Sequence, residues 1–299
     1  MPNPPASAVA GAALRLSPLI VACLAATWII WGSTYLAIQW ALVSFPPYWQ
    51  MGTRFLIAGG GLLLFMRLRG ATMPTSRQWR NAVVIGALML GGGMGGTALS
   101  EQSVSSGIIV AFIAVTPALI ALFNRLFGIR PARLEALGIG IGMAGVLMLT
   151  QGAAFSASRA GLIAVMSASL CWSLGSVLSQ QRFPLASGAV GFASEMLCGG
   201  AILMLMSWLR HEQPTLPPDP KALWSWVYLI VFGSLLAFNA YMLLLARASA
   251  ALASSYSIVN PVIAMLLGIA LNNEVVTSFE WLAATIILVG VMLIMMGKR

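Results

Sequence analysis

Charged side chains are scarce in this sequence, and two residue types are almost absent. Only 8% of the 299 residues are charged; histidine occurs once, at His211, and aspartate once, at Asp219. A multi-histidine metal site, a haem site or an aspartate-rich site like those of membrane prenyl- and phosphotransferases therefore lacks its ligands. We expect neither a metal ion nor another cofactor.

Motifs for nucleotide chemistry are missing as well. There is no Gly-Lys-Ser/Thr sequence, so the chain shows no sign of using ATP. Gly91, Gly93 and Gly96 satisfy the spacing GxGxxG, but they lie inside an apolar run with no strand before them, which excludes a dinucleotide site. No nucleophile, base and orienting residue form a set, so we do not expect an enzyme.

Apolar sequence is abundant. The chain is 60% hydrophobic with a mean hydropathy of +0.92, which is more than a soluble core could bury. The net charge of +9 could suggest nucleic acid, but the basic residues lie at the ends of apolar runs, where membrane topology explains them better. We therefore predict an all-α integral membrane protein whose surroundings are lipid, with no nucleic-acid partner. The three cysteines lie inside apolar runs and are interpreted as small buried residues: Cys23, Cys171 and Cys198.

The runs are long enough for ten transmembrane helices, since a span needs about 20 residues. Their expected limits are 17–42, 46–66, 80–100, 105–127, 134–151, 160–181, 187–209, 223–245, 249–271 and 279–297.

Lys and Arg are distributed unevenly between the two sides of such a bundle. One side holds twelve: Arg15, Arg67, Arg69, Arg77, Arg80, Arg125, Arg130, Arg133, Arg182, Arg247, Lys298 and Arg299. The other side holds three: Arg159, Arg210 and Lys221. Cytoplasmic loops carry the excess of basic residues, so we expect both termini in the cytoplasm.

The second half of the chain repeats the first. Trp31 and Gln39 are matched by Trp172 and Gln180 141 residues later, and Pro117 is matched by Pro261 at 144. We expect two five-helix units, residues 1–152 and 153–299. Because five is an odd number, the second unit enters the membrane upside down, and the fold is an inverted repeat.

Prolines and glycines interrupt three of the expected spans. Pro261 leaves the carbonyl of Ser257 free and bends its helix, and Pro117 does the same in the first half. Five glycines among residues 91–96 allow either bending or close packing. The expected hinge positions are Pro117, Pro261, Gly92 and Gly95.

These features resemble the drug/metabolite transporter superfamily, in its ten-helix EamA-type branch. The resemblance covers nearly the whole chain and rests on Trp28-Ile29-Ile30-Trp31-Gly32, Cys171-Trp172-Ser173, Pro117 with Gly145-Val146, and Pro261 with Asn273-Glu274 and Gly290-Val291. Within that branch the chain is most similar to YddG-type exporters of aromatic amino acids.

The resemblance implies a secondary transporter of the bacterial inner membrane that exports amino acids, aromatic ones above all, and related small metabolites. It also implies alternating access around a central cavity between the two repeats. The chain departs from the family at one point. Many members carry a glutamate thirteen residues after each proline; Glu274 fits, but Arg130 stands at the other position, so a symmetric role is not expected.

Polar and aromatic residues recur on one face of several expected helices, where they could line a path for a solute. Ordinary packing between helices is the alternative explanation. The candidates are Trp28, Trp31, Thr34, Tyr35, Gln39, Trp172, Ser176, Gln180, Asn239, Tyr256, Ser257 and Asn260.

Arg54 and Glu195 are the only charges well inside the expected spans, and they are equivalent in the repeat because 54 + 141 = 195. At 1.5 Å per residue each lies about 12 Å from its nearer membrane face, so the two could pair or hold a zwitterion. Glu195 could instead carry a proton, and both could be mere packing residues.

Other functions stay open at this stage. One is proton-coupled efflux of other amphipathic solutes; a facilitator, a passive channel and an integral-membrane lipid enzyme are further alternatives. The sequence leaves the oligomeric state open, and a monomer is compatible with it.

Overall fold

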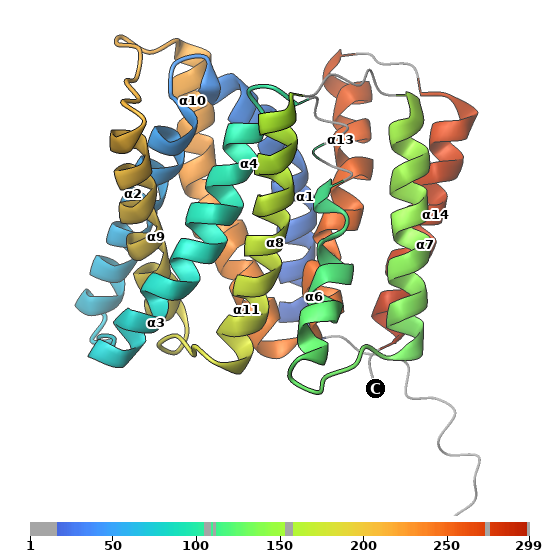
Figure 1. The fold of residues 1–299 in the computed structure, drawn as a ribbon, viewed down its shortest axis with the longest axis horizontal. Coiled ribbons are helices and arrows are strands. Elements are labelled where there is room, and N and C mark those ends of the chain that lie inside the picture. The colour runs from blue at the N-terminus through green and yellow to red at the C-terminus, as the bar shows by residue number, and fades with distance from the viewer. Residues whose placement is uncertain (1–16, 105–108, 110–111, 153–157, 273–275, 298–299) are drawn as a thin grey trace, which may run out of the picture.

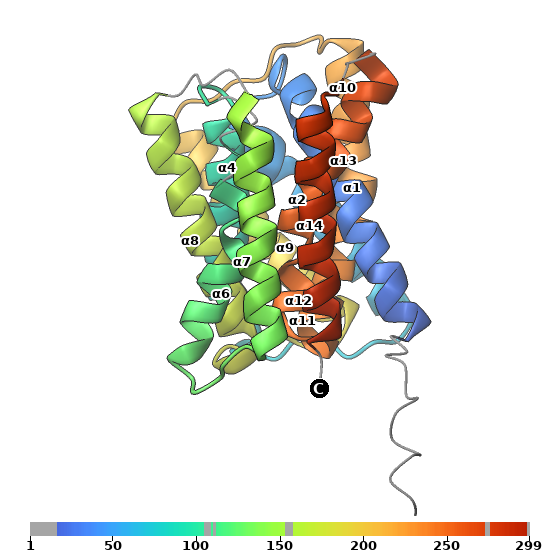
Figure 2. The same ribbon diagram turned by 90° about the vertical axis from the view of Figure 1, so that its right-hand side faces the viewer.

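The structure is a computed structural model, and it describes residues 17–104, 109, 112–152, 158–272 and 276–297. The described part of the chain contains helices and no strand, and the long helices run side by side in one bundle (Figures 1 and 2). Their bounds are α1 Pro18–Leu42, α2 Pro47–Leu68, α3 Ser76–Gly86, η2 Ala87–Met94, α4 Gly95–Ser100, α6 Thr116–Arg125, α7 Arg133–Leu149, η3 Thr150–Gly152, α8 Arg159–Gln181, α9 Ala189–Leu209, α10 Pro220–Tyr228, η4 Leu229–Phe238, α11 Asn239–Arg247, α12 Ala250–Ser254, α13 Tyr256–Asn272 and α14 Ser278–Met296.

Eight helical segments of the described chain are long and apolar enough to cross a membrane. Two further spans were expected. The span predicted over 134–151 corresponds to α7, which has 17 residues. The one predicted over 105–127 includes α6 and several residues that lie outside the described ones. The all-α membrane fold is confirmed. The boundary predicted between residues 152 and 153 adjoins undescribed residues and stays a prediction.

Two pairs of helices show how the halves are related. The second helix of each unit, α2 and α9, pack antiparallel: Gly52 lies against Met204, and Gly59 lies against Ala193. The fifth helices, α7 and α14, are likewise antiparallel, with Gly138 against Ile294 and side by side in Figure 2. Equivalent helices that pair antiparallel are related by an axis in the membrane plane, so the repeat is inverted.

The third segment of each unit contains a π-helical stretch at the same place. The first unit runs α3–η2–α4 and the second runs α10–η4–α11. A π-turn inside an α-helix is rare and frequently marks a functional site. Both stretches contain glycine, at Gly93 and Gly233, and both adjoin the interior described below.

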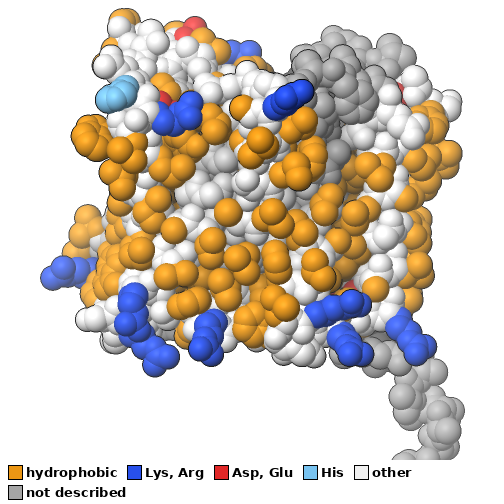
Figure 3. All heavy atoms as spheres, viewed as in Figure 1, with side chains coloured by type: hydrophobic (Ala, Val, Ile, Leu, Met, Phe, Trp, Pro, Cys, Tyr) orange, Lys and Arg blue, Asp and Glu red, His pale blue; other side chains and the backbone are white. Residues whose placement is uncertain are grey.

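The bundle has a basic end and an apolar flank. Lys and Arg side chains gather at the lower end in Figure 3, while hydrophobic side chains cover the flank between the two ends. We call this the basic end, and it holds Arg67, Arg69, Arg77, Arg80, Arg125, Arg130, Arg133, Arg182 and Arg247. The opposite end holds Arg159, Arg210 and Lys221, and hydrogen bonds there join the two halves, such as Ser158 Oγ to Ser103 Oγ at 2.7 Å.

Close backbone contact between α7 and α14 predicts a sharp difference between two glycines of one helix. A Cβ atom at residue 138 would lie 2.5 Å from the Gly290 carbonyl oxygen, whereas one at residue 140 would meet nothing within 4 Å. Gly138→Ala should therefore lower the free energy of unfolding by about 1–3 kcal/mol. The matched control Gly140→Ala should change it by less than about 1 kcal/mol. Thermal unfolding of the detergent-solubilised variants measures both, and equal stability would contradict the packing.

Candidate functional site

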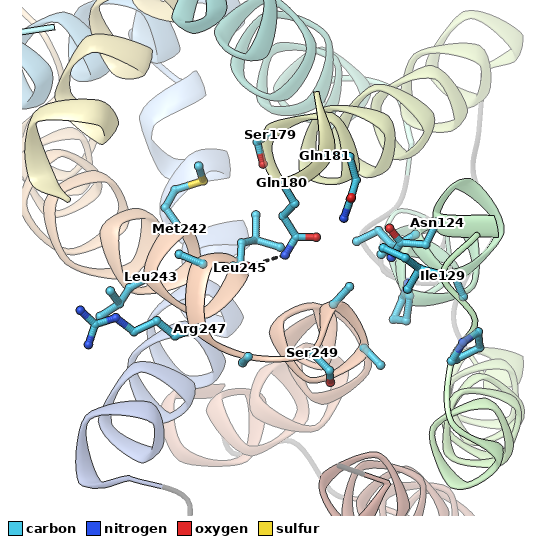
Figure 4. Close-up of a pocket in the computed structure, with 18 of the residues that line it drawn as sticks. Asn124, Ile129, Ser179, Gln180, Gln181, Met242, Leu243, Leu245, Arg247 and Ser249 are labelled. Carbon is cyan, nitrogen blue, oxygen red and sulfur yellow. Dashed lines mark hydrogen bonds between the residues drawn. The ribbon is translucent and has the colours of Figure 1, made fainter. Parts of the chain in front are cut away.

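A wide cavity of about 910 Å³ opens at the basic end. Its walls come from both halves. In Figure 4, Asn124 lies across the cavity from the α11 residues Leu243 and Arg247, and Gln180 projects between them. The Gln180 amide donates to the Leu245 carbonyl. This volume is in the range of small-molecule sites, so a solute can enter from the basic end. We call it the basic-end cavity.

A second, deeper cavity lies further into the bundle and has a volume of about 50 Å³. It adjoins the first: Thr116 lines the deep cavity, and the next residue, Pro117, lines the basic-end cavity. Residues from α1, η2, α4, α6, α8 and α13 surround it, so both halves contribute. They are Trp31, Thr34, Tyr35, Ile38, Gly93, Met94, Thr97, Ile113, Thr116, Ala168, Ser169, Trp172, Tyr256 and Asn260. At this size the deep cavity has room for water but not for an amino acid.

Four aromatic rings meet beside the deep cavity. Trp31 lies 4.6 Å from Tyr256 and 5.6 Å from Trp172 between ring centroids, and both pairs are edge-to-face. Tyr241 completes the group at 5.2 Å from Trp172. Such pairs are worth about 0.5–1.5 kcal/mol each beyond their burial, so the cluster is a firm apolar surface.

The two tryptophans take equivalent places against the π-helical segments. Trp31 Nε1 donates to the Gly233 carbonyl at 3.3 Å. On the other side, a Cβ atom at residue 93 would come within 3.1 Å of the Trp172 ring. Gly93 therefore has no room for a side chain, and each tryptophan packs on a glycine of the opposite unit.

Six predicted lining residues surround the deep cavity, and one lines the basic-end cavity. The six are Trp31, Thr34, Tyr35, Trp172, Tyr256 and Asn260, and the seventh is Gln180.

Five other candidates line neither cavity. Gln39 is exposed on the surface of α1, on the side away from the interior. Trp28 Nε1 donates to Ser255 Oγ at 3.0 Å, and Asn239 Nδ2 donates to the Leu235 carbonyl at 2.8 Å. Ser176 and Ser257 are buried and hydrogen-bond to neighbouring groups. For these positions the packing alternative fits the structure.

The predicted hinges take different forms. Pro117 does not bend a continuous helix, because α6 begins at Thr116 and the proline occupies its first turn. Pro261 lies inside α13, and the chain breaks earlier, at Ser255, between α12 and α13. A Cβ atom at Gly92 would lie 2.7 Å from Cys171 Sγ, and one at Gly95 would lie 2.7 Å from Leu203 Cδ2. These two glycines permit close packing.

Arg54 and Glu195 do not hydrogen-bond each other. Arg54 Nε donates to Ser234 Oγ at 3.0 Å, while Arg54 Nη1 and Nη2 and both Glu195 oxygens have no partner. The antiparallel register of α2 and α9 explains the separation, because Gly59 rather than Arg54 lies beside Met196. The direct pair proposed from the sequence is therefore not formed in this structure.

Sequence reasoning missed several residues of the interior. Thr97 and Ser169 line the deep cavity, and Tyr241 belongs to the aromatic group. Thr97 lies one turn after Gly93, the glycine against which Trp172 packs. The helical period could therefore have identified Thr97 as a lining residue. Within the described residues, no three His, Cys, Asp or Glu side chains come together as metal ligands.

Comparison with known proteins gives consistent matches. A model described as the EamA-like transporter family matches residues 16–151 and again residues 159–296. The uncharacterised inner membrane transporter YedA of Escherichia coli K12 is 43% identical over 285 residues, which cover 95% of this chain and 92% of that protein. Protein PagO of Salmonella typhimurium is 23% identical, with 91% of each chain covered. One solved crystal structure has the same fold, with a TM-score of 0.75 at 21% identity over 92% of this chain and 95% of that chain.

The cavity geometry predicts which positions of α8 a water-soluble reagent reaches from the basic end. Ser179 lines the basic-end cavity, whereas Ser176, one turn away, is fully buried. In a background without the native cysteines, Ser179→Cys should react with a membrane-impermeant maleimide at least tenfold faster than Ser176→Cys. Mass spectrometry of the labelled protein measures the rates. Equal labelling of both positions would contradict an open basic end.

Proposed function

Because the chain belongs to the EamA-like transporter family and is a membrane transporter, we propose that it exports amino acids, aromatic ones above all, and related small metabolites. The observation that carries this proposal is the deep cavity between the two units, with Trp31, Trp172 and Tyr256 on its walls. Aromatic rings stack on an aromatic solute, while Thr34 and Asn260 offer hydrogen bonds to its polar end.

Alternating access is the proposed mechanism. The basic end would face the cytoplasm, by the excess of Lys and Arg there, with both termini on that side. The basic-end cavity would then be the cytoplasmic entrance, and contacts such as Thr215 N to the Ser44 carbonyl at 2.8 Å would hold the halves together at the opposite end. Rocking of one unit against the other would open the opposite end and release the solute.

A carrier is favoured over a channel, because the two units are related by inversion. The energy source is a separate question. Glu195 is fully buried, and neither of its oxygens has a partner, which favours a proton-coupled variant of the same export. A facilitator without coupling is the alternative.

Counterflow in proteoliposomes tests the proposal. Vesicles loaded with unlabelled L-phenylalanine should accumulate external labelled L-phenylalanine transiently, while empty liposomes should not. A carrier gives this exchange and a channel does not. Absence of counterflow with every aromatic and aliphatic amino acid would overturn the proposed substrate. Repeating the assay with and without a pH gradient distinguishes proton coupling from facilitation, and the Glu195→Gln variant should lose the dependence on that gradient.

The aromatic walls predict a specific loss of transport. Trp172→Ala should lower the counterflow rate of L-phenylalanine about tenfold, because one lost aromatic contact of about 1.4 kcal/mol corresponds to that factor. The matched control Trp208→Ala removes a tryptophan that is 70% exposed on the lipid-facing flank, and it should keep the wild-type rate. Trp172→Phe should retain part of the activity. An unchanged rate in correctly folded Trp172→Ala would remove this residue from the transport path.

A further inference from the structure

Buried polar side chains with unused hydrogen-bonding capacity gather between the deep cavity and the opposite end. Arg54 is fully buried, and its Nη1 and Nη2 atoms have no partner. Gln50, one turn away on the same face of α2, is also fully buried, and neither of its amide atoms is bonded. Both carboxylate oxygens of Glu101, which follows α4, are shielded from solvent and unpartnered. Of the polar side-chain atoms in these three groups, only Arg54 Nε has a hydrogen-bond partner among the described residues, Ser234 Oγ, and the others have none.

The guanidinium of Arg54 lies directly behind the wall of the deep cavity. A Cβ atom placed at Gly233 would be 3.5 Å from Arg54 Nη2 and equally 3.5 Å from Thr34 Cγ2. Thr34 is one of the residues that line the deep cavity. About one side chain therefore separates the unbonded Nη2 atom of Arg54 from the deep cavity, where the solute would bind.

Glu101 lies near the same cavity but comes from another part of the chain, just after α4. Glu101 lies one turn after Thr97, which lines the deep cavity. Its two carboxylate oxygens have no partner, as is also true of Nη1 and Nη2 of Arg54. Arg54 behind Thr34 and Glu101 one turn after Thr97 thus both lie next to residues that line the deep cavity, and Trp31, Trp172 and Tyr256 lie on its walls.

The chemistry of these groups fits a solute that carries both charges. Two free guanidinium N–H groups in one plane match a carboxylate bidentately, better than any other partner. A free carboxylate is the natural acceptor for an ammonium group, and the unpartnered Asn260 Oδ1 in the deep cavity is a second acceptor. Buried charges are retained in membrane proteins mainly where they handle a solute or an ion.

We propose that Arg54 and Glu101 bind the two charged groups of a zwitterionic α-amino acid at the end of the deep cavity next to Thr34 and Thr97. Arg54 receives the carboxylate, and Glu101 receives the ammonium, when the cavity expands to admit the solute. This inference rests on the proposed function and specifies its substrate class. In this proposal Arg54 acts together with Glu101, at the end of α4, and not with Glu195, the partner that repeat symmetry suggested.

A rival arrangement uses the same residues without a solute. Arg54 and Glu101 could pair with each other when the opposite end opens, as part of a gate. The two arrangements differ in what a charge exchange does. A gate pair works in either order, so Arg54→Glu combined with Glu101→Arg would restore transport. A solute site does not, because the carboxylate and ammonium of the amino acid would then meet like charges.

Three ligands separate the roles of the two residues. L-phenylalanine has both charges, phenethylamine lacks the carboxylate, and 3-phenylpropionate lacks the ammonium. Apparent affinities for each are obtained from ligand-induced shifts in the melting temperature of the purified protein. Wild-type protein should bind L-phenylalanine at least tenfold more tightly than either analogue.

The variants should lose only the contact that each residue makes. Arg54→Gln should weaken L-phenylalanine binding at least tenfold and leave phenethylamine unchanged, and Arg54→Lys should fall between wild type and Arg54→Gln. Glu101→Gln should weaken L-phenylalanine and leave 3-phenylpropionate unchanged. Arg67→Gln, an exposed arginine near the end of the same helix, is the matched control and should behave as wild type. The melting temperature without ligand reports whether each variant folds.

The possible failures are distinguishable. If the wild-type protein neither binds nor exchanges any amino acid, the proposed function fails and this inference fails with it. If it exchanges L-phenylalanine while the affinities of Arg54→Gln and Glu101→Gln match those of wild type, only the inference fails. Restored counterflow in the charge-exchanged double variant would assign the residues to a gate and also overturn the inference.

Discussion

Lipid hydrocarbon offers no hydrogen bonds, so every irregular stretch of backbone in this bundle must be received by protein or by a cavity. The described residues contain four such stretches: η2, η4, the break at Ser255 and the start of α6 at Thr116. All four adjoin the interior. The η4 carbonyl of Gly233 accepts from Trp31, and Ser255 Oγ accepts from Trp28. Gly93 of η2 and Thr116 border the deep cavity itself. The solute path therefore lies where the helices are least regular, and regular helices such as α2, α7, α9 and α14 form the outside.

The inverted arrangement gives these outer helices a second role. Each outer pair, α2 with α9 and α7 with α14, contains one helix from each unit and is joined by contacts between glycines and neighbouring backbone. Such close contacts resist separation, so movement is easier among the segments that line the cavities. The cavities themselves do not share the two-fold symmetry, because the wide cavity opens at the basic end, whereas hydrogen bonds join the two halves at the opposite end. Exchange of the two units' conformations would open the opposite end, which is why inversion favours a carrier.

Much of the fold could be predicted because its signals are local and repeated. Apolar runs predicted an all-α membrane bundle, and the offset of 141–144 residues between equivalent positions indicated two units. The tryptophan pair was also predictable, since Trp31 and Trp172 occupy one position of the repeat. The directions of side chains after an irregular stretch could not be predicted. A π-turn holds an extra residue and rotates the helix that follows, so Asn239 could not be placed by a 3.6-residue period.

The remaining misses have equally physical causes. Gln39 was assigned to the inner face because it lies near the helical face of Trp31 and Thr34, yet it is exposed, whereas its repeat partner Gln180 lines the basic-end cavity. Glu101 was not among the candidates from the sequence, since nothing in the sequence shows that a carboxylate just after α4 is shielded from solvent. Repeat symmetry favoured Glu195 as the partner of Arg54. Equivalent positions of an inverted repeat lie at equal depths from opposite membrane faces, but they need not touch each other. Contact depends on the register of α2 against α9, which only the packing of their glycines decides.

The order of groups along the path bears on how a solute would travel. The basic-end cavity comes first, the aromatic rings and the deep cavity follow, and the buried charges of Arg54 and Glu101 lie beyond them. An isolated buried charge destabilises a membrane protein, so its position at the far end of the path calls for a partner that arrives there. A solute with a charged head and an aromatic tail satisfies both regions at once only if its head points toward the opposite end. On the proposed mechanism the charged head would therefore leave first, while stacking on Trp31 and Trp172 holds the tail until the basic end has closed behind it.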